Sequence, residues 1–186
     1  MTETEQPVGV EIDPAYLEDP TLAFLRAYWE MKRGGRAMPC RADIRASDLK
    51  EHLGSVILLD VLPGGRDFRY RLIGTLVTQY FLKDSTGKTV AEAFAEQGPE
   101  VQAAAVSVFR KVARDRCILR AWGSAGWMEG EFEQFDSLYL PLSDDGENVT
   151  HIFEGFVFNK PEVMLARQIA KANGGKLLKV PKKPAA

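Results

Sequence analysis

The stretch Phe68-Arg69-Tyr70-Arg71-Leu72-Ile73-Gly74-Thr75 decides the fold of this chain of 186 residues. Its first five residues alternate between apolar side chains and arginines, and this period of two predicts a β-strand with one apolar and one basic face. The turn Pro63-Gly64-Gly65-Arg66 and the aliphatic run from Ser55 to Leu62 precede it, which predicts a β-hairpin. After Gly74 the alternation stops, so we expect helices to follow.

Three helical segments are predicted after this hairpin. Leu76, Tyr80 and Phe81 have the spacing of a short helix, and Val90 to Ala95 is a second short piece. A longer helix is predicted from Pro99 to Arg114. Its apolar stripe consists of Val101, Ala105, Val108, Phe109 and Val112. The stripe predicts that this helix packs across one face of the sheet.

The segment before the hairpin predicts another helix. Asp19-Pro20 is a typical start, because the carboxylate caps free backbone N–H groups and proline fits the first helical turn. Apolar residues continue at helical spacing as far as Arg33, and Gly34-Gly35 ends the pattern. We therefore expect a helix from Pro20 to Arg33, followed by a shorter one from Ser47 to Leu53.

Three more strands are predicted in the second half of the chain: Cys117 to Trp122, Phe132 to Leu142 and Val149 to Phe158. The last two are joined by Ser143 to Asn148, whose Asp145-Gly146 pair is typical of a hairpin turn. Strands grouped at both ends with helices between them favour an α+β domain. The predicted fold is a five-stranded antiparallel sheet with helices on one face, plus N-terminal and C-terminal helices.

Composition divides the chain into three parts. Residues 1–18 carry little pattern and are expected to be a flexible arm, and residues 19–159 form the domain, including its N-terminal helix. Residues 160–186 contain seven basic residues and one acidic residue, and we expect a helix from Pro161 to Ala172 followed by a disordered tail. A solvated tail is the favoured interpretation; contact with acidic lipid, nucleic acid or an acidic partner is the alternative.

Overall composition places the chain among cytoplasmic globular proteins. Apolar residues make up 45% and charged residues 27%, with a formal net charge of −2, which gives no reason to expect nucleic acid. No apolar run reaches the ~18 residues of a membrane span. The acidic segment Met1 to Glu5 is not a secretion signal, and Cys40 and Cys117 are too few for a disulfide framework.

Two sets of residues occur in an order found in a known family. The first is Tyr28-Trp29, Arg33-Gly34-Gly35-Arg36, Pro39, Arg41 and Asp43-Ile44; the second is Phe68 to Thr75 followed by Thr86-Gly87. Together they resemble the N-terminal signature and the middle of a bacterial subgroup of PAS domains, long catalogued as a domain of unknown function. The resemblance covers roughly Pro20 to Phe158.

The resemblance implies a five-stranded antiparallel sheet that cups several helices. The space between them holds a small molecule in some PAS proteins and is filled by side chains in others. The resemblance also implies a sensory or regulatory role. PAS domains usually pass a signal to a fused kinase, cyclase or DNA-binding domain, and because none is recognisable here we expect a separate partner protein.

Aromatic residues from both sheet and helices are the candidates for contact with such a ligand: Tyr70, Phe81, Phe94, Phe109, Trp122 and Phe156. Their alternative role is to fill the core. Glu154 shares its strand face with Ile152 and Phe156, which places a carboxylate on the core side, where it needs a partner. Arg71 and Arg120 are the candidate partners, and in the alternative Glu154 lies in water at the strand end.

Leu25, Tyr28 and Trp29 are candidate partner or dimer contacts. They give the N-terminal helix more apolar bulk than a lone amphipathic helix needs. We expect them to bury against the sheet or against a second copy of the chain, as in a homodimer.

Four charged residues, Arg36, Arg41, Asp43 and Arg71, are structural or anion-binding candidates. We expect Arg41 and Asp43 to lie on an extended segment and to clip the N-terminal helix to the domain through charge-assisted hydrogen bonds. In the alternative, Arg36 and Arg41 bind an anionic ligand or partner.

No catalytic or metal-binding constellation is recognisable in the sequence. His52, His151, Cys40 and Cys117 show no paired ligand spacing. The carboxylates at 129, 131 and 133 share one strand face that we expect to be wet, since three like charges repel one another. We predict no enzyme and no metal site, and the sequence requires no cofactor. An axial haem histidine is the alternative, because it needs only one residue.

Two hypotheses about function follow. The first is a stand-alone PAS-like regulatory domain that binds a small apolar or amphipathic ligand and signals to a separate partner. The second is a ligand-free interaction or dimerisation module of the same fold. An enzyme on a similar cone-shaped scaffold is disfavoured, because no aspartate or histidine base is predicted on an apolar face.

Overall fold

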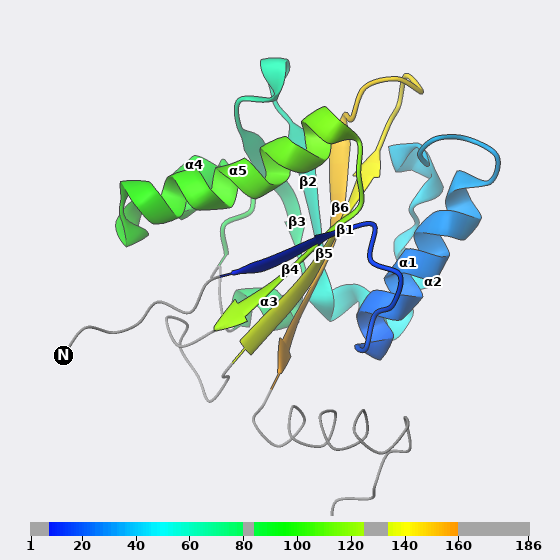
Figure 1. Ribbon diagram of the computed structural model, residues 1–186, viewed down its shortest axis with the longest axis horizontal. Helices are drawn as coiled ribbons and strands as arrows, with labels where there is room; N and C mark the ends of the chain where they lie inside the picture. Colours follow the sequence, from blue (N-terminus) through cyan, green and yellow to red (C-terminus); the bar gives the residue numbers. More distant parts are fainter. Residues whose placement is uncertain (1–7, 80–83, 125–133, 160–186) are drawn as a thin grey trace, which may run out of the picture.

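The computed structural model describes residues 8–79, 84–124 and 134–159. Within these ranges the chain forms one antiparallel sheet of six strands in the order β1-β4-β5-β6-β2-β3 (Figure 1). The strands are β1 (Gly9–Ile12), β2 (Val56–Val61), β3 (Phe68–Ile73), β4 (Leu119–Ser124), β5 (Gln134–Leu142) and β6 (His151–Asn159). The predicted α+β class and antiparallel sheet are confirmed, with one strand more than expected.

The additional strand is β1. The sequence predicts a flexible arm over residues 1–18, but Gly9–Ile12 pairs antiparallel with β4, with Gly9 opposite Trp122 and Ile12 opposite Leu119. The alternation in this segment covers too few residues to indicate a strand by itself. Pairing with β4 supplies the ladder hydrogen bonds that hold the segment in place.

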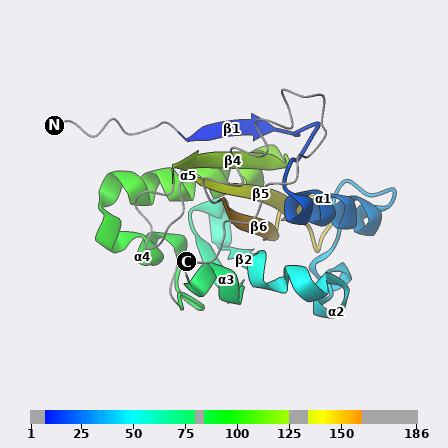
Figure 2. The same ribbon diagram turned by 90° about the horizontal axis from the view of Figure 1, so that it is seen from below.

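Helices cover both faces of the sheet (Figure 2). α1 (Pro20–Arg33) and α2 (Ala46–Leu49) lie on one side, whereas α4 (Val90–Ala93) and α5 (Pro99–Asp115) lie on the other. α3 (Thr75–Val77) follows β3 directly. Short 3₁₀ turns at Arg41–Asp43, Lys50–Ser55, Pro63–Gly65 and Ala95–Gln97 complete the described connections.

The predicted bounds of α1 are confirmed, and its caps show why. The Asp19 carboxylate accepts hydrogen bonds from the backbone N–H groups of Thr21, at 2.8 Å, and Leu22, at 3.3 Å, which satisfies two free donors of the first turn. Gly34 ends the helix with φ +57°, a backbone conformation that glycine adopts without steric cost.

Gly74 marks the change from strand to helix for a steric reason. A β-carbon at this position would overlap the backbone carbonyls of Leu53 and Gly54. The Gly74 N–H also donates to the Val56 carbonyl oxygen at 2.7 Å. Glycine therefore allows the end of β3 to approach the start of β2 closely before the chain turns into α3.

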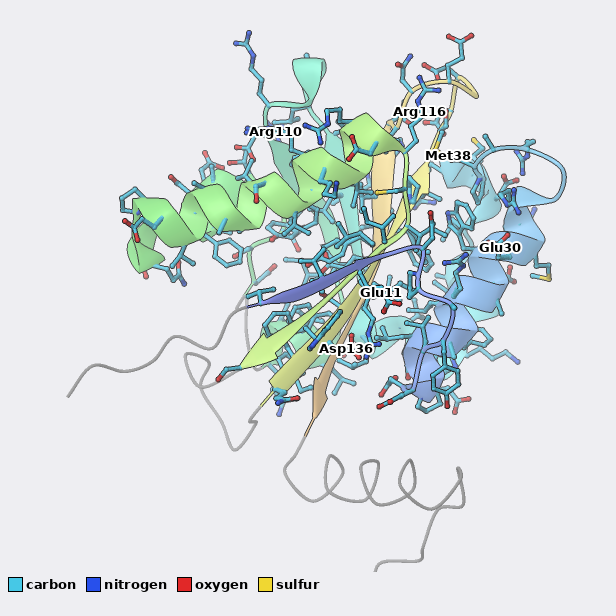
Figure 3. All side chains as sticks on the ribbon, viewed as in Figure 1. Glu11, Glu30, Met38, Arg110, Arg116 and Asp136 are labelled. Atoms are coloured by element: carbon cyan, nitrogen blue, oxygen red, sulfur yellow. The ribbon has the colours of Figure 1, made fainter. Side chains whose placement is uncertain are left out.

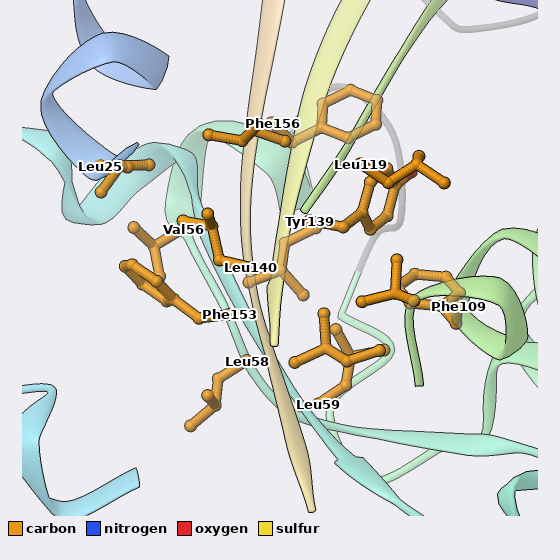
Figure 4. Packing of buried hydrophobic residues seen from close by; sticks show 14 of the residues in the cluster. Leu25, Val56, Leu58, Leu59, Phe109, Leu119, Tyr139, Leu140, Phe153 and Phe156 are labelled. Atoms are coloured by element: carbon orange, nitrogen blue, oxygen red, sulfur yellow. The ribbon is translucent and has the colours of Figure 1, made fainter. Parts of the chain in front are cut away.

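The core lies on both sides of the sheet (Figure 4). Residues opposite each other on neighbouring strands share a face. On one face, Phe153 and Val56 pack near Leu25 of α1, and on the other Tyr139 and Phe156 lie towards α5. The apolar face of α5 buries Val106, Phe109 and Val112, whereas Val101 in its first turn is exposed.

Candidate functional site

Glu154 is a buried acid in the middle of the sheet. It lies on β6 opposite Tyr139 of β5 and Ile57 of β2, and it faces the side of the sheet that α5 covers. Only 2% of Glu154 is exposed. The sequence predicts this face correctly, and the alternative that Glu154 lies in water is wrong.

The polar surroundings of Glu154 consist of two hydroxyl groups. Tyr139 stands directly opposite Glu154 on β5, and its hydroxyl lowers the pKa of the Glu154 carboxyl group. Ser137 Oγ lies 3.1 Å from the Tyr139 hydroxyl and 3.1 Å from the Ala121 carbonyl oxygen. The second carboxyl oxygen, Oε2, has no hydrogen-bond partner among the residues that the structure describes.

Burial controls the protonation of this cluster. Removal from water raises the pKa of Glu154 to about 8, and the hydrogen bond from Tyr139 opposes that rise only in part. Glu154 is therefore mostly a neutral carboxylic acid at pH 7. Burial, and then the nearby Glu154, hold the pKa values of Tyr70 and Tyr139 well above that of free tyrosine, so both phenols stay protonated.

The predicted arginine partners of Glu154 are wrong. Arg71 is exposed and pairs with Asp60 through Nε and Oδ1 at 2.7 Å. Arg120 pairs with Asp136 through Nη2 and Oδ2, also at 2.7 Å. Arg120 stands opposite Leu138 rather than Tyr139, so it points to the other face of the sheet. The strand register, which the local pattern does not reveal, separates these charges from Glu154.

Four of the six aromatic ligand candidates are buried: Tyr70, Phe94, Phe109 and Phe156. The Phe109 ring lies 5.2 Å from that of Tyr139 in an edge-on arrangement, and the Phe156 ring stacks on Phe135 at 5.5 Å. The structure thus packs Phe109 against Tyr139, the residue that lies opposite Glu154 in the sheet.

The remaining two aromatic candidates do not join this group. Trp122 is 36% exposed and lies on the opposite face, where the Arg120 guanidinium stacks 5.0 Å from its ring centre. Strand β4 turns every second side chain away from α5, so the structure does not bring Trp122 together with the other aromatic candidates. Phe81 lies outside the described residues, as do the carboxylates at 129, 131 and 133.

Leu25, Tyr28 and Trp29 are buried within their own chain. Trp29 Nε1 donates to the Pro141 carbonyl oxygen of β5 at 2.8 Å, and the Tyr28 hydroxyl accepts from the backbone N–H of Arg45 at 3.0 Å. The structure therefore shows the first of the two expected outcomes, burial against the sheet. A homodimer through α1 stays a prediction, and it would have to use other side chains of this helix.

The clip at the end of α1 uses a different arginine from the predicted one. Arg36 Nη2 lies 2.6 Å from Asp43 Oδ2, and the same carboxylate oxygen accepts from the Cys40 backbone N–H at 2.8 Å. Arg41 instead donates to the Ile44 carbonyl oxygen. The segment is a 3₁₀ turn, Arg41–Asp43, and not extended, so Arg41 and Asp43 do not point the same way.

Sequence reasoning missed Tyr139 and Ser137 as neighbours of Glu154. β5 is buried along most of its length, so its alternation carries no visible pattern. A signal was nevertheless present in the hairpin turn around Asp145-Gly146. Counting outward from that turn, with Leu142 opposite His151, places Tyr139 opposite Glu154.

Within residues 8–79, 84–124 and 134–159, no group of three or more histidine, cysteine, aspartate or glutamate side chains is placed to hold a metal ion. In the same ranges, no helix has the length and apolar character needed to cross a membrane.

The antiparallel sheet, with a long helix across one face, defines an α+β domain. A family model described as a PAS domain matches residues 17–156. The chain therefore belongs to the PAS domain family, whose members are generally sensory or regulatory modules and typically not enzymes.

Two solved structures are similar to this chain. The PAS domain of BvgS from Bordetella pertussis has 15% sequence identity and a TM-score of 0.45, covering 65% of this chain and 88% of the other. An RNA-binding light-oxygen-voltage receptor has 14% identity and a TM-score of 0.47, covering 91% of this chain and 43% of the receptor. This chain thus spans less than half of the receptor's length. No curated protein matches the sequence.

Proposed function

We propose that this protein is a sensory PAS domain that binds a small amphipathic ligand between the sheet and α5 and signals to a separate partner protein. The observation that carries the proposal is Glu154, which is buried but leaves Oε2 without a hydrogen-bond partner in the described part of the chain. A buried polar group without a partner costs about 1–3 kcal/mol. A ligand that supplies the partner recovers that cost on binding.

The protonation state of Glu154 indicates the chemistry of the ligand. With a pKa of about 8 the group is a neutral acid at pH 7. Its Oε2, which has no hydrogen-bond partner in the described part of the chain, can then carry the proton and donate it. The matching ligand group is a hydrogen-bond acceptor such as a ketone, ester or ether oxygen. Tyr70, Phe109 and Phe156 supply apolar surface for the rest of the molecule.

The position of α1 supports a route from this site to a partner. Gly155 follows Glu154 on β6 and faces α1. The proposed ligand site and α1 therefore lie on opposite faces of the same strand. A β-carbon at Gly155 would lie 2.5 Å from Leu25 Cδ1 and 2.9 Å from Leu22 Cδ2, so helix and strand are in direct contact. A ligand that shifts β6 would therefore also shift α1. We propose that this movement of α1 transmits the signal to the partner protein or controls the formation of a homodimer.

A ligand-free interaction module is the second candidate, and one observation favours it. The Phe109 ring packs against the rings of Phe68 and Tyr139 at centroid distances of 5.4 Å and 5.2 Å. Two depressions lined by described residues lie elsewhere, one beside α5 and one beside α2. In a ligand-free module, side chains alone would fill the space between the sheet and α5.

A thermal-shift screen separates the two candidates. Neutral compounds with one acceptor oxygen should raise the Tm of the wild-type protein, and the rise should grow with compound concentration. The shift should be larger at pH 6 than at pH 9, because the proton that Glu154 donates is lost above pH 8. Glu154→Leu, which keeps the volume and removes the acid, is the matched variant. Equal shifts in wild type and Glu154→Leu, or none in either, would favour the ligand-free module.

A further inference from the structure

An open cleft lies outside the core, between α5, α4 and the turn that joins β2 to β3. Figure 3 shows Arg110 on α5 close to this turn. The cleft has a volume of about 220 Å³ and is lined by Arg66, Asp67, Ala91, Gln102, Ala103, Val106 and Arg110. Since a water molecule occupies about 30 Å³ of liquid, the space suits a molecule smaller than a typical drug-sized ligand.

Two arginines line this cleft, and neither has an acidic partner among the described residues. Neither Arg66 nor Arg110 forms an ion pair with another residue of the described ranges, in contrast to Arg71, Arg114 and Arg120. Arg110 Nη2 donates to the Arg66 carbonyl oxygen at 2.7 Å, which ties α5 to the turn. This bond uses one of the five N–H donors of Arg110 and leaves the others available.

The other polar groups of the cleft are already fixed by the backbone. Asp67 Oδ1 accepts from the N–H groups of Phe68, at 2.8 Å, and Ala91, at 3.4 Å. Gln102 Nε2 donates to the Ala91 carbonyl oxygen at 2.6 Å. Neither side chain must be reorganised to receive a ligand, and the carboxylate of Asp67 disfavours a second negative charge on that ligand.

We propose that this cleft is a binding site for a small monoanionic carboxylate with a short apolar body. Two arginines and one aspartate give the lining a net charge of +1, which matches a single carboxylate. A carboxylate accepts paired N–H bonds from guanidinium groups. Ala91, Ala103 and Val106 provide the apolar surface for the body of the ligand. The site is separate from Glu154 and does not depend on the proposed core ligand.

Isothermal titration of the full chain with benzoate at low ionic strength tests the site. Benzamide is the probe of matched shape without charge, and inorganic phosphate is the probe for a multiply charged anion. We expect benzoate to bind more tightly than either. Arg66→Gln should weaken benzoate binding about tenfold, the usual effect of losing a hydrogen bond to a charged group. Arg69→Gln, on the exposed face of β3 outside the cleft, should leave binding unchanged.

Arg110→Gln should weaken binding by a similar factor, but it also removes the bond to the turn. Arg66→Gln, whose side chain makes no such bond, therefore decides the outcome, with a thermal melt to show that the variant is folded. Three results would each overturn the proposal. The first is equal binding of benzoate and benzamide, and the second is no benzoate binding at 10 mM, roughly the weak limit expected for such small ligands. The third is an equal effect of Arg66→Gln and Arg69→Gln on benzoate binding. Tighter binding of phosphate would overturn the monoanion assignment.

Discussion

Phe109→Ala should lower the free energy of unfolding by about 3–5 kcal/mol, the cost of removing a well-packed buried phenylalanine. Phe109 lies on the buried face of α5, with its ring 5.4 Å from that of Phe68 and 5.2 Å from that of Tyr139. Removing it takes away the main aromatic contact between α5 and the sheet. Urea unfolding, followed by circular dichroism, measures the loss.

Val101→Ala on the same helix is the matched control, because Val101 is 40% exposed. Its effect should stay within about 0.5 kcal/mol, as for most surface substitutions. A loss below about 1 kcal/mol for Phe109→Ala would contradict the packed arrangement. Such a small loss would indicate that the ring borders an open ligand space. The full loss means that the proposed ligand enters only when α5 moves away from the sheet.

Raising the pH should destabilise the protein through Glu154 by about 3–5 kcal/mol, the equivalent of a pKa shift of roughly three units. The pKa of this acid rises from 4.5 to about 8 on folding, so between these values the folded protein holds a proton that the unfolded chain has released. Stability from this group is therefore complete below pH 4.5, declines as the pH rises to 8, and stays constant above that.

Comparison with Glu154→Gln isolates this contribution, because glutamine does not ionise. Free energies of unfolding measured from pH 5 to pH 9 should show a steeper decline in the wild type than in the variant. In Tyr139→Phe, which lacks the hydrogen bond that lowers the Glu154 pKa, the decline should extend to higher pH. Parallel profiles for wild type and Glu154→Gln would show that the acid ionises freely in the folded state.

Local chemistry was sufficient to predict much of the fold. Helix α1 has both of its ends encoded by neighbouring residues, Asp19 and Gly34, and the hairpin around Gly64 combines a turn signal with alternation. β1 could not be predicted, because four residues become a strand only when β4 lies beside them. Such pairing depends on contacts more than a hundred residues apart in the sequence.

The same limit explains the partial prediction of the site. Alternation along β6 gives the face of Glu154, since it depends only on neighbouring positions. The partner of Glu154 depends on the register between strands, and that register selects Tyr139 over Arg120. The face of Trp122 could not be predicted for a similar reason. The sequence predicts its strand, but nothing in the local pattern shows which face of the sheet α5 covers.

Native mass spectrometry of the protein purified from its own cells tests the central claim most directly. The account predicts that wild-type protein carries a small molecule that is released on denaturation, and that Glu154→Leu carries much less of it. A folded wild-type protein observed only at the mass of the bare chain, in gentle conditions and with no compound that shifts its Tm, would contradict the account.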